Sequence, residues 1–303
     1  MAAMRIAVTG ASGLIGSALT ASLAGDGHDV VALVRRDPRG PGEARWDPET
    51  GTVDLEALRG CGAVVHLAGA PVAARRWTDE RKRVLRDSRV LGTATIARAV
   101  AALDPEPVLV CGSAIGYYGD TGDRFVDEDD PAGEGFLADL VRDWEAAADP
   151  AREAGVRTVH ARTGLVVAHG GGAWGALFPV FRAGLGGRMG NGRQFWSFVS
   201  LADEVAALRF AIDNAELSGP VNLTAPEPLT NREITAAMGK VLRRPTVLPV
   251  PGFALRAVLG EFAEDVLGSQ RVRPARLLDA GFTFTHPRIE DAIRAALPPS
   301  NRI

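Results

Sequence analysis

Lysine and cysteine are scarce in this chain of 303 residues. Of its 34 basic residues only Lys82 and Lys240 are lysines, and its two cysteines are Cys61 and Cys111. Two cysteines are too few for a disulfide scaffold and lack the spacing of metal ligands, so we expect two buried thiols, no metal and a cytoplasmic location. A mechanism that needs a lysine has two candidates.

A strong net charge and long apolar runs are also missing. A net charge of −3 and a pI near 6.0 give no basic field, so nucleic acid is not expected as a partner. No apolar run approaches the ~20 residues of a membrane span, and no signal-peptide pattern precedes the first strand. We expect an ordinary globular protein, a monomer or homodimer, acting on a small-molecule substrate.

Apolar runs and helical patterns alternate through the first half of the chain. Short runs rich in valine and leucine predict buried strands, and residues with helical apolar spacing lie between them. This order predicts an α/β fold, a Rossmann-type doubly wound parallel sheet. The predicted strands are 5–9, 29–36, 63–69, 107–114 and 156–167, the helices between them are 14–25, 79–103 and 136–154, and residues 45–55 predict a hairpin.

The pattern weakens after residue 169. We therefore predict a Rossmann domain over 1–169 and a smaller α/β substrate-side portion over 170–303, with a C-terminal cap from about residue 245. Residues 168–198 predict a long binding loop. Its rings either line a substrate pocket or form the core that joins the two portions. These rings are Trp174, Phe178, Phe181, Phe195 and Trp196.

A glycine turn, TGASGLIG, follows the first predicted strand and opens the first helix. Glycine permits the tight turn and the close approach of a pyrophosphate, and the helix N-terminus supplies free N–H groups. In this context the triplet predicts a dinucleotide site. Its residues are Gly10, Ser12, Gly13, Leu14, Ile15 and Gly16.

The second strand ends in two arginines, Arg35 and Arg36. An acidic residue at this place binds the adenosine ribose of NAD, whereas arginine suits the 2′-phosphate of NADP. We therefore expect NADP(H) as the cofactor in preference to NAD(H). Asp37, the next residue, is an acidic group that would still allow some binding of NAD(H). The alternative to a cofactor role is that Arg35 and Arg36 are two solvated surface arginines.

The segments TGASGLIG, VRR, HLAG, SAIGYYG and GFTF together resemble the extended short-chain dehydrogenase/reductase family. The chain is most similar to an atypical subfamily of epimerase-like proteins with a small C-terminal domain of unknown function, whose signature resembles QRVRPARLLDAGFTF at 270–284. The resemblance covers nearly the whole chain. It implies an oxidoreductase or epimerase acting on a small carbonyl or hydroxyl compound, for instance a nucleotide sugar.

The resemblance also implies further cofactor contacts. HLAG places Leu67, Ala68 and Gly69 beside the adenosine and ribose, and SRVLGT makes Arg89 a phosphate or ribose contact. RTGLVV places Leu165 at the nicotinamide side. For Arg89 the alternative is one more solvated helix arginine.

Typical family members carry a tyrosine and, four residues later, a lysine that lowers the pKa of the phenol. That pair is absent. Thr121 and Gly122 stand four residues after the two tyrosines, Tyr117 and Tyr118, and Phe136 occupies the family's tyrosine place. An unassisted phenol titrates near ~10, so it is a poor acid/base at neutral pH.

Three hypotheses remain for the chemistry. In the first, the protein is an enzyme in which Tyr117 or Tyr118 is the acid/base, Ser113 orients the substrate and an arginine replaces the lysine. In the second, it is a non-catalytic NADP(H)-binding sensor or interaction protein, and the two tyrosines pack against the nicotinamide or the pocket wall; the alternative to any role for the tyrosines is that their rings only fill a loop. In the third, Asp120 or Glu128 reacts while the cofactor is a structural support.

Overall fold

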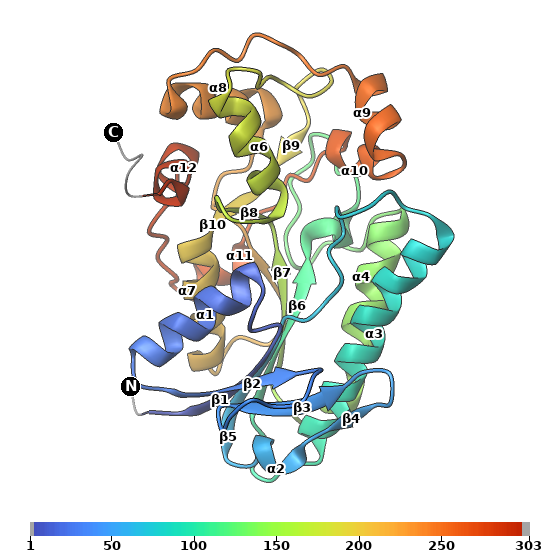
Figure 1. The fold of residues 1–303 in the computed structure, drawn as a ribbon, viewed down its shortest axis with the longest axis vertical. Helices are drawn as coiled ribbons and strands as arrows, with labels where there is room; N and C mark the ends of the chain where they lie inside the picture. Colours follow the sequence, from blue (N-terminus) through green and yellow to red (C-terminus); the bar gives the residue numbers. More distant parts are fainter. Residues whose placement is uncertain (1–2, 299–303) are drawn as a thin grey trace.

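The computed structural model describes residues 3–298, and its centre is an eight-stranded sheet (Figure 1). The order is β11-β7-β6-β5-β1-β2-β3-β4, and all neighbours are parallel except β3 and β4. The strands are β1 (Arg5–Thr9), β2 (Asp29–Val34), β3 (Glu43–Asp47), β4 (Thr52–Val53), β5 (Cys61–His66), β6 (Val108–Ala114), β7 (Thr158–Thr163) and β11 (Gly219–Leu223). The predicted Rossmann-type fold is confirmed.

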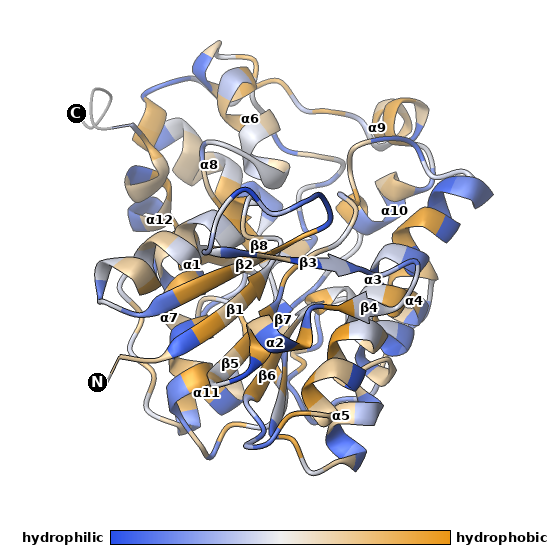
Figure 2. Cartoon of the chain, turned by 60° about the horizontal axis from the view of Figure 1, so that its bottom comes forward, coloured by the Kyte–Doolittle hydropathy of each residue, from blue (hydrophilic) through white to orange (hydrophobic). Residues whose placement is uncertain are grey.

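Helices cover both faces of the sheet, as a doubly wound fold requires. One face packs on α1 (Leu14–Gly25), α7 (Leu201–Asp213) and α11 (Ala275–Asp279). The other lies under α2 (Leu55–Leu58), α3 (Asp79–Ala101), α4 (Phe136–Ala146) and α5 (Asp149–Glu153). The central strands β1, β5 and β6 are mainly hydrophobic between their ends (Figure 2), because each packs on both layers.

The remaining elements lie above the carboxyl ends of the strands (Figure 1). A separate apolar core there contains Trp174, Phe178, Phe181 and Trp196, so these four rings form the core of this part of the chain. The elements are the 3-10 helix η1 (Ile115–Tyr118), β8 (Leu165–Val167), α6 (Gly172–Arg182), β9 (Phe195–Trp196), β10 (Phe198–Ser200), β12 (Leu229–Thr230), α8 (Asn231–Leu242), α9 (Gly252–Leu259), α10 (Phe262–Leu267) and α12 (Ile289–Ala296).

The structure differs from the sequence-based expectation in three places. The strand predicted over 156–167 divides at Gly164, where a Cβ atom would lie 2.7 Å from the backbone oxygen of Ser197; β8 pairs with β10 instead. The helix predicted over 136–154 is broken before Pro150, which has no N–H group to continue it. Residues 172–182 form a helix, although they were expected in a loop.

The portion assigned to the substrate side returns to the sheet before the chain ends. After α6, the chain places α7 on the sheet and adds β11 as its edge strand. Both cysteines are buried free thiols, as expected. Within residues 3–298 no helix combines the length and apolar character needed to cross a bilayer.

Candidate functional site

The glycine turn has the geometry of a phosphate-binding loop. Gly10 has a φ of +67° and its carbonyl oxygen accepts a hydrogen bond from the N–H of Gly13 at 2.9 Å. A Cβ atom at Gly16 would lie 2.1 Å from the same oxygen, so the helix packs tightly against the turn. Gly13 caps α1 without a side-chain acceptor, which leaves the first N–H groups of the helix open to an anion.

A cleft of about 920 Å³ begins at this turn and runs across the carboxyl ends of β1, β2 and β5. Eight predicted cofactor residues line it: Gly10, Ser12, Gly13, Arg35, Arg36, Leu67, Ala68 and Gly69. The other five lie outside this lining: Leu14, Ile15 and Gly16 in the first turn of α1, Arg89 on α3 and Leu165 on β8. The cleft therefore joins three separate sequence motifs.

The far end of the cleft contains residues that sequence reasoning missed. A short hairpin that begins with β3 brings Trp46, Pro48 and Glu49 to the cleft. They form a wall there together with Leu33 and Leu91. Leu33, Trp46, Pro48 and Leu91 give this end of the cleft an apolar surface, which suits an adenine ring. The signal available in the sequence was a tryptophan, Trp46, ten residues after Arg36 and at the start of the predicted hairpin.

The two arginines at the end of β2 have different surroundings. Arg36 forms two hydrogen bonds with the carboxylate of Glu43, at 2.7 and 2.5 Å. The hydrogen bonds from Arg36 and from the backbone of Arg39 lower the pKa of Glu43 to about 2. Asp37 pairs with Arg45 at 2.7 Å. Arg35 lines the cleft, and no carboxylate lies within 4 Å of it in the described chain.

Arg89 is not the solvated helix arginine that was the alternative, because it is only 8% exposed. Its guanidinium donates to the carbonyl oxygen of Leu85 at 3.1 Å and lies over the ring of Trp144. Burial, reinforced by the charge of Arg81, lowers its pKa to about 10. It packs behind Gly69, where a Cβ atom would lie 3.4 Å from the guanidinium carbon, and so places positive charge next to the cleft.

His66 and Thr9 fix the backbone that borders the cleft. The Thr9 hydroxyl oxygen accepts hydrogen bonds from the N–H groups of Leu67 and Ala68, at 3.0 and 3.2 Å. Its own hydrogen therefore points to His66 Nδ1 at 2.8 Å, which makes Nδ1 an acceptor. Burial lowers the pKa of His66 to about 4, so the ring is neutral and positions the loop.

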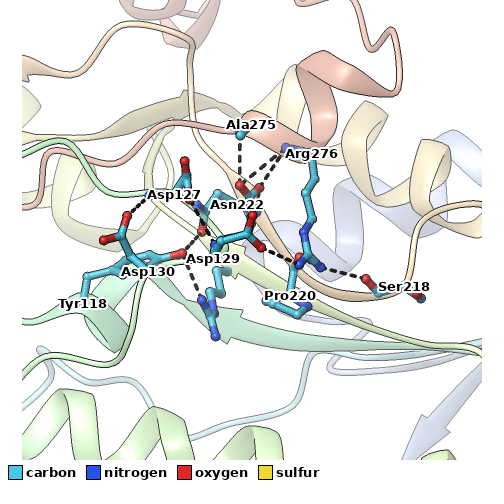
Figure 3. Close-up of polar contacts among 11 residues, drawn as sticks. Tyr118, Asp127, Asp129, Asp130, Ser218, Pro220, Asn222, Ala275 and Arg276 are labelled. Carbon is cyan, nitrogen blue, oxygen red and sulfur yellow. Dashed lines mark hydrogen bonds and ion pairs between the residues drawn. The ribbon is translucent and has the colours of Figure 1, made fainter.

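The hydroxyl group of Tyr118 is fully engaged. It accepts a hydrogen bond from Arg162 at 2.9 Å and donates one to Asn222 Oδ1 at 2.8 Å (Figure 3). Burial raises the pKa of Tyr118 far above its ordinary value, although Arg162 opposes the shift. The neighbouring ring of Tyr117 stacks on the guanidinium of Arg162, 3.5 Å from its carbon.

Ser113, the predicted orienting hydroxyl, points at Glu145 instead of an open surface. It donates to Glu145 Oε1 at 2.6 Å, and Arg162 binds both oxygens of that carboxylate at 2.8 Å. Burial opposes ionisation of Glu145, but the hydrogen bonds and charge of Arg162 outweigh it and lower the pKa of the carboxyl. These side chains form one buried network beside residues 115–130, the segment after β6 that we call the tyrosine loop.

The two acidic candidates bind backbone N–H groups of the C-terminal segment. Asp120 accepts from Ser269 at 2.9 Å, and Glu128 accepts from Ala275 at 3.1 Å and from Asn222 at 2.8 Å. Figure 3 shows this segment lying against the loop. Both carboxylates therefore hold the segment on the tyrosine loop, in addition to a bridge between Val126 and Val272.

Phe136, to which the resemblance assigns the family's tyrosine position, has a ring without a hydroxyl group. Phe136 packs on Trp77, with ring centroids 5.0 Å apart, and on the ammonium group of Lys82, 5.1 Å from its centroid. Lys82 forms an ion pair with Glu261 at 2.6 Å. One of the two lysines therefore lies near the expected site, but beside phenylalanine.

The sequence and the structure both match known proteins. Residues 6–223 match the NAD dependent epimerase/dehydratase family, and residues 250–296 match a Domain of unknown function (DUF1731). Epimerase family protein Mb2239 of Mycobacterium bovis is 50% identical over 294 residues, which cover 97% of each chain. Human epimerase family protein SDR39U1 is 35% identical over 96% of this chain and 99% of its own.

Solved structures show the same relationship. The human SDR39U1 structure with NADPH superposes with a TM-score of 0.88, at 34% identity, covering 97% of this chain and 99% of that one. A nucleoside-diphosphate sugar epimerase from Corynebacterium glutamicum superposes with a TM-score of 0.80, at 35% identity, over 98% of this chain and 58% of its own. The chain therefore belongs to the NAD-dependent epimerase/dehydratase family of extended short-chain dehydrogenases/reductases, and carries the DUF1731 domain at its C-terminus.

Proposed function

We propose that this protein binds NADP(H) and is an oxidoreductase or epimerase acting on a small carbonyl or hydroxyl compound. The observation that carries the proposal is the cleft itself, which begins at an anion-binding helix N-terminus and ends at two arginines and an apolar wall. Its relative of known structure was solved with NADPH. The similar nucleoside-diphosphate sugar epimerase supports a nucleotide sugar as one substrate class to test first.

The residues present fit this cofactor. The open N–H groups after Gly13 would hold the pyrophosphate, and the wall at Trp46 would hold the adenine. Arg35 and Arg36 would bind the 2′-phosphate, with Glu43 giving up part of its hold on Arg36. The cofactor supplies the hydride, and these residues bind and orient it.

The preference of the protein for NADPH over NADH tests the proposal directly. We expect Arg35→Ala with Arg36→Ala to raise the Kd for NADPH about 100-fold, and that for NADH about threefold or less, because only NADPH carries the 2′-phosphate. Nicotinamide fluorescence titration measures both constants. Arg45→Ala is the matched control, since Arg45 is a nearby surface arginine outside the lining. Equal losses for the two cofactors would contradict the choice of NADP(H).

A non-catalytic sensor is the second candidate, and one observation favours it. The phenol of Tyr118 is bound on both sides, and Phe136 and Leu140 hold the places of the tyrosine and lysine. A sensor would bind NADPH but oxidise none of it with a broad panel of carbonyl compounds, including nucleotide sugars. Turnover that disappears in Tyr117→Phe while NADPH binding is retained would establish the enzyme instead.

A further inference from the structure

A second cavity, of about 620 Å³, lies outside the cofactor cleft and shares no lining residue with it. Its walls are β7, the start of β11 and the ends of α4 and α5. This volume falls in the range of small-molecule sites. The cavity is therefore a candidate for a ligand other than the cofactor.

The floor of the cavity is β7, which is polar on one of its two buried faces, whereas strands of a doubly wound sheet are usually apolar on both. Val159 and Ala161 face the core beneath α7, as expected for a parallel strand. The opposite face of β7 carries Thr158, His160 and Arg162, all at least 96% buried. Three consecutive polar positions on one buried face need partners, because unpaired polar groups are costly inside a protein.

Two of the three polar side chains have such partners. Arg162 binds Glu145 and Tyr118, and the Thr158 hydroxyl donates to the carbonyl oxygen of Val156 at 3.1 Å. His160 differs, since its Nδ1 is buried without a hydrogen-bond partner. Burial lowers the pKa of His160, so the ring is neutral. A buried N–H group without a partner is rarer than an unpaired acceptor, so we place the proton on Nε2, as a donor.

The charges around the cavity favour an anion. Arg142, Arg152 and Arg157 line it, against the carboxylates of Glu145 and Asp149. Arg152 pairs with Asp149 at 2.6 Å, Arg142 pairs with Asp139, and the carboxylate of Glu145 is bound by Arg162 of β7. The lining therefore keeps an excess of positive charge.

Arg157 is the source of that excess. Its guanidinium donates to four backbone carbonyl groups near the end of α7, those of Ala211, Ile212, Asn214 and Leu217. In the described residues no carboxylate lies within 4 Å of it. Carbonyl groups satisfy its hydrogen bonds, and they and the more distant Asp213 offset only part of its unit charge.

The geometry points to a binding site for the phosphate or carboxylate group of a small polar molecule, placed between Arg152 and Arg157 and hydrogen-bonded to His160. The hydroxyl groups of Tyr117 and Ser218, which also line the cavity, are available to further polar groups of the ligand. Tyr117 stacks on Arg162, so a ligand here would touch the network beneath the tyrosine loop.

Titration with inorganic phosphate and, separately, with succinate tests this site. The protein is first saturated with NADPH, so that the cofactor cleft cannot take up the added anion and its occupancy is known independently. We expect the side-chain nitrogen resonances of His160 to shift and saturate, with a Kd on the order of 1 mM. Saturation by phosphate alone assigns a phosphoryl ligand, and saturation by succinate alone assigns a carboxylate.

Arg152→Gln should raise that Kd by about tenfold. Arg294→Gln is the matched control, because Arg294 is similarly exposed and also pairs with an aspartate three residues before it, on α12. Both substitutions are at the surface, so folding should be preserved. The site is disproved if neither anion gives a saturating shift of His160, or if the two variants bind as the wild type does.

Discussion

The phenol oxygen of Tyr118 accepts a hydrogen bond from Arg162 across 2.9 Å, and the same guanidinium holds both oxygens of Glu145. Arg162 is thus a cationic neighbour of a phenol, as the lysine is in typical family members, although it occupies a different position in the chain. Burial nevertheless raises the pKa of Tyr118, and the charge and hydrogen bond of Arg162 oppose this shift without reversing it. The pair is a structural contact between β7 and the tyrosine loop.

Replacing Tyr118 by phenylalanine should therefore reduce stability. The change leaves an Arg162 donor and the Asn222 acceptor buried without a partner, and we expect a loss of about 1–3 kcal/mol in the free energy of unfolding. Denaturant unfolding measures it. Tyr117→Phe is the control, since it retains the ring that stacks on Arg162. A stable Tyr118→Phe variant would show that the network tolerates the loss.

Gly16 should not accept even one methyl group. Its Cβ would lie 2.1 Å from the Gly10 oxygen, so Gly16→Ala must displace the turn or α1. We expect a loss of NADPH affinity of about tenfold or more, together with a lower Tm. Gly25→Ala, at the end of the same helix, has no atom within 4 Å of the new Cβ and should leave both quantities unchanged. Similar behaviour of the two variants would argue against a tight turn.

Glu43 should compete with the cofactor for Arg36. Removing its charge in Glu43→Gln leaves the guanidinium free for a 2′-phosphate, and we expect NADPH to bind up to about fivefold more tightly, with NADH unaffected. The gain should shrink at high salt, since the ion pair is exposed. Weaker NADPH binding would mean that Glu43 holds Arg36 in its binding position.

Glu204 should make stability depend on pH. It is fully buried at the start of α7, and burial raises its pKa to about 8 against a hydrogen bond from Thr163. The folded state therefore binds more protons than the unfolded state, and stability falls as pH rises from the unfolded pKa through the folded one. We expect a decrease of roughly 3 kcal/mol between pH 5 and pH 8.

The variant Glu204→Gln should lack this decrease, because an amide does not ionise. Unfolding curves for both proteins across that pH range provide the measurement. Parallel stability profiles would show that Glu204 remains ionised in the folded protein.

Much of the cofactor cleft was predictable because its parts are local. The glycine turn, the arginine pair and the HLAG segment each follow a strand, and the carboxyl ends of neighbouring parallel strands meet at one edge of a sheet. The rest of the lining was not predictable in this way. Trp46 reaches the cleft through a hairpin. Arg89 was expected from the resemblance, but its burial behind the cleft depends on the packing of α3 on the sheet.

The sequence alone determined most of the order of strands and helices, the glycine turn and the absence of a tyrosine–lysine pair, since each depends on residues a few positions apart. Only the tertiary structure decided what the two tyrosines do. The acceptor for the Tyr118 hydroxyl is Asn222, 104 residues away, and the loop is held by a C-terminal segment about 150 residues away. Such long-range contacts decide whether a phenol is free or bound, because burial and partners, and not its neighbours in the chain, set its pKa.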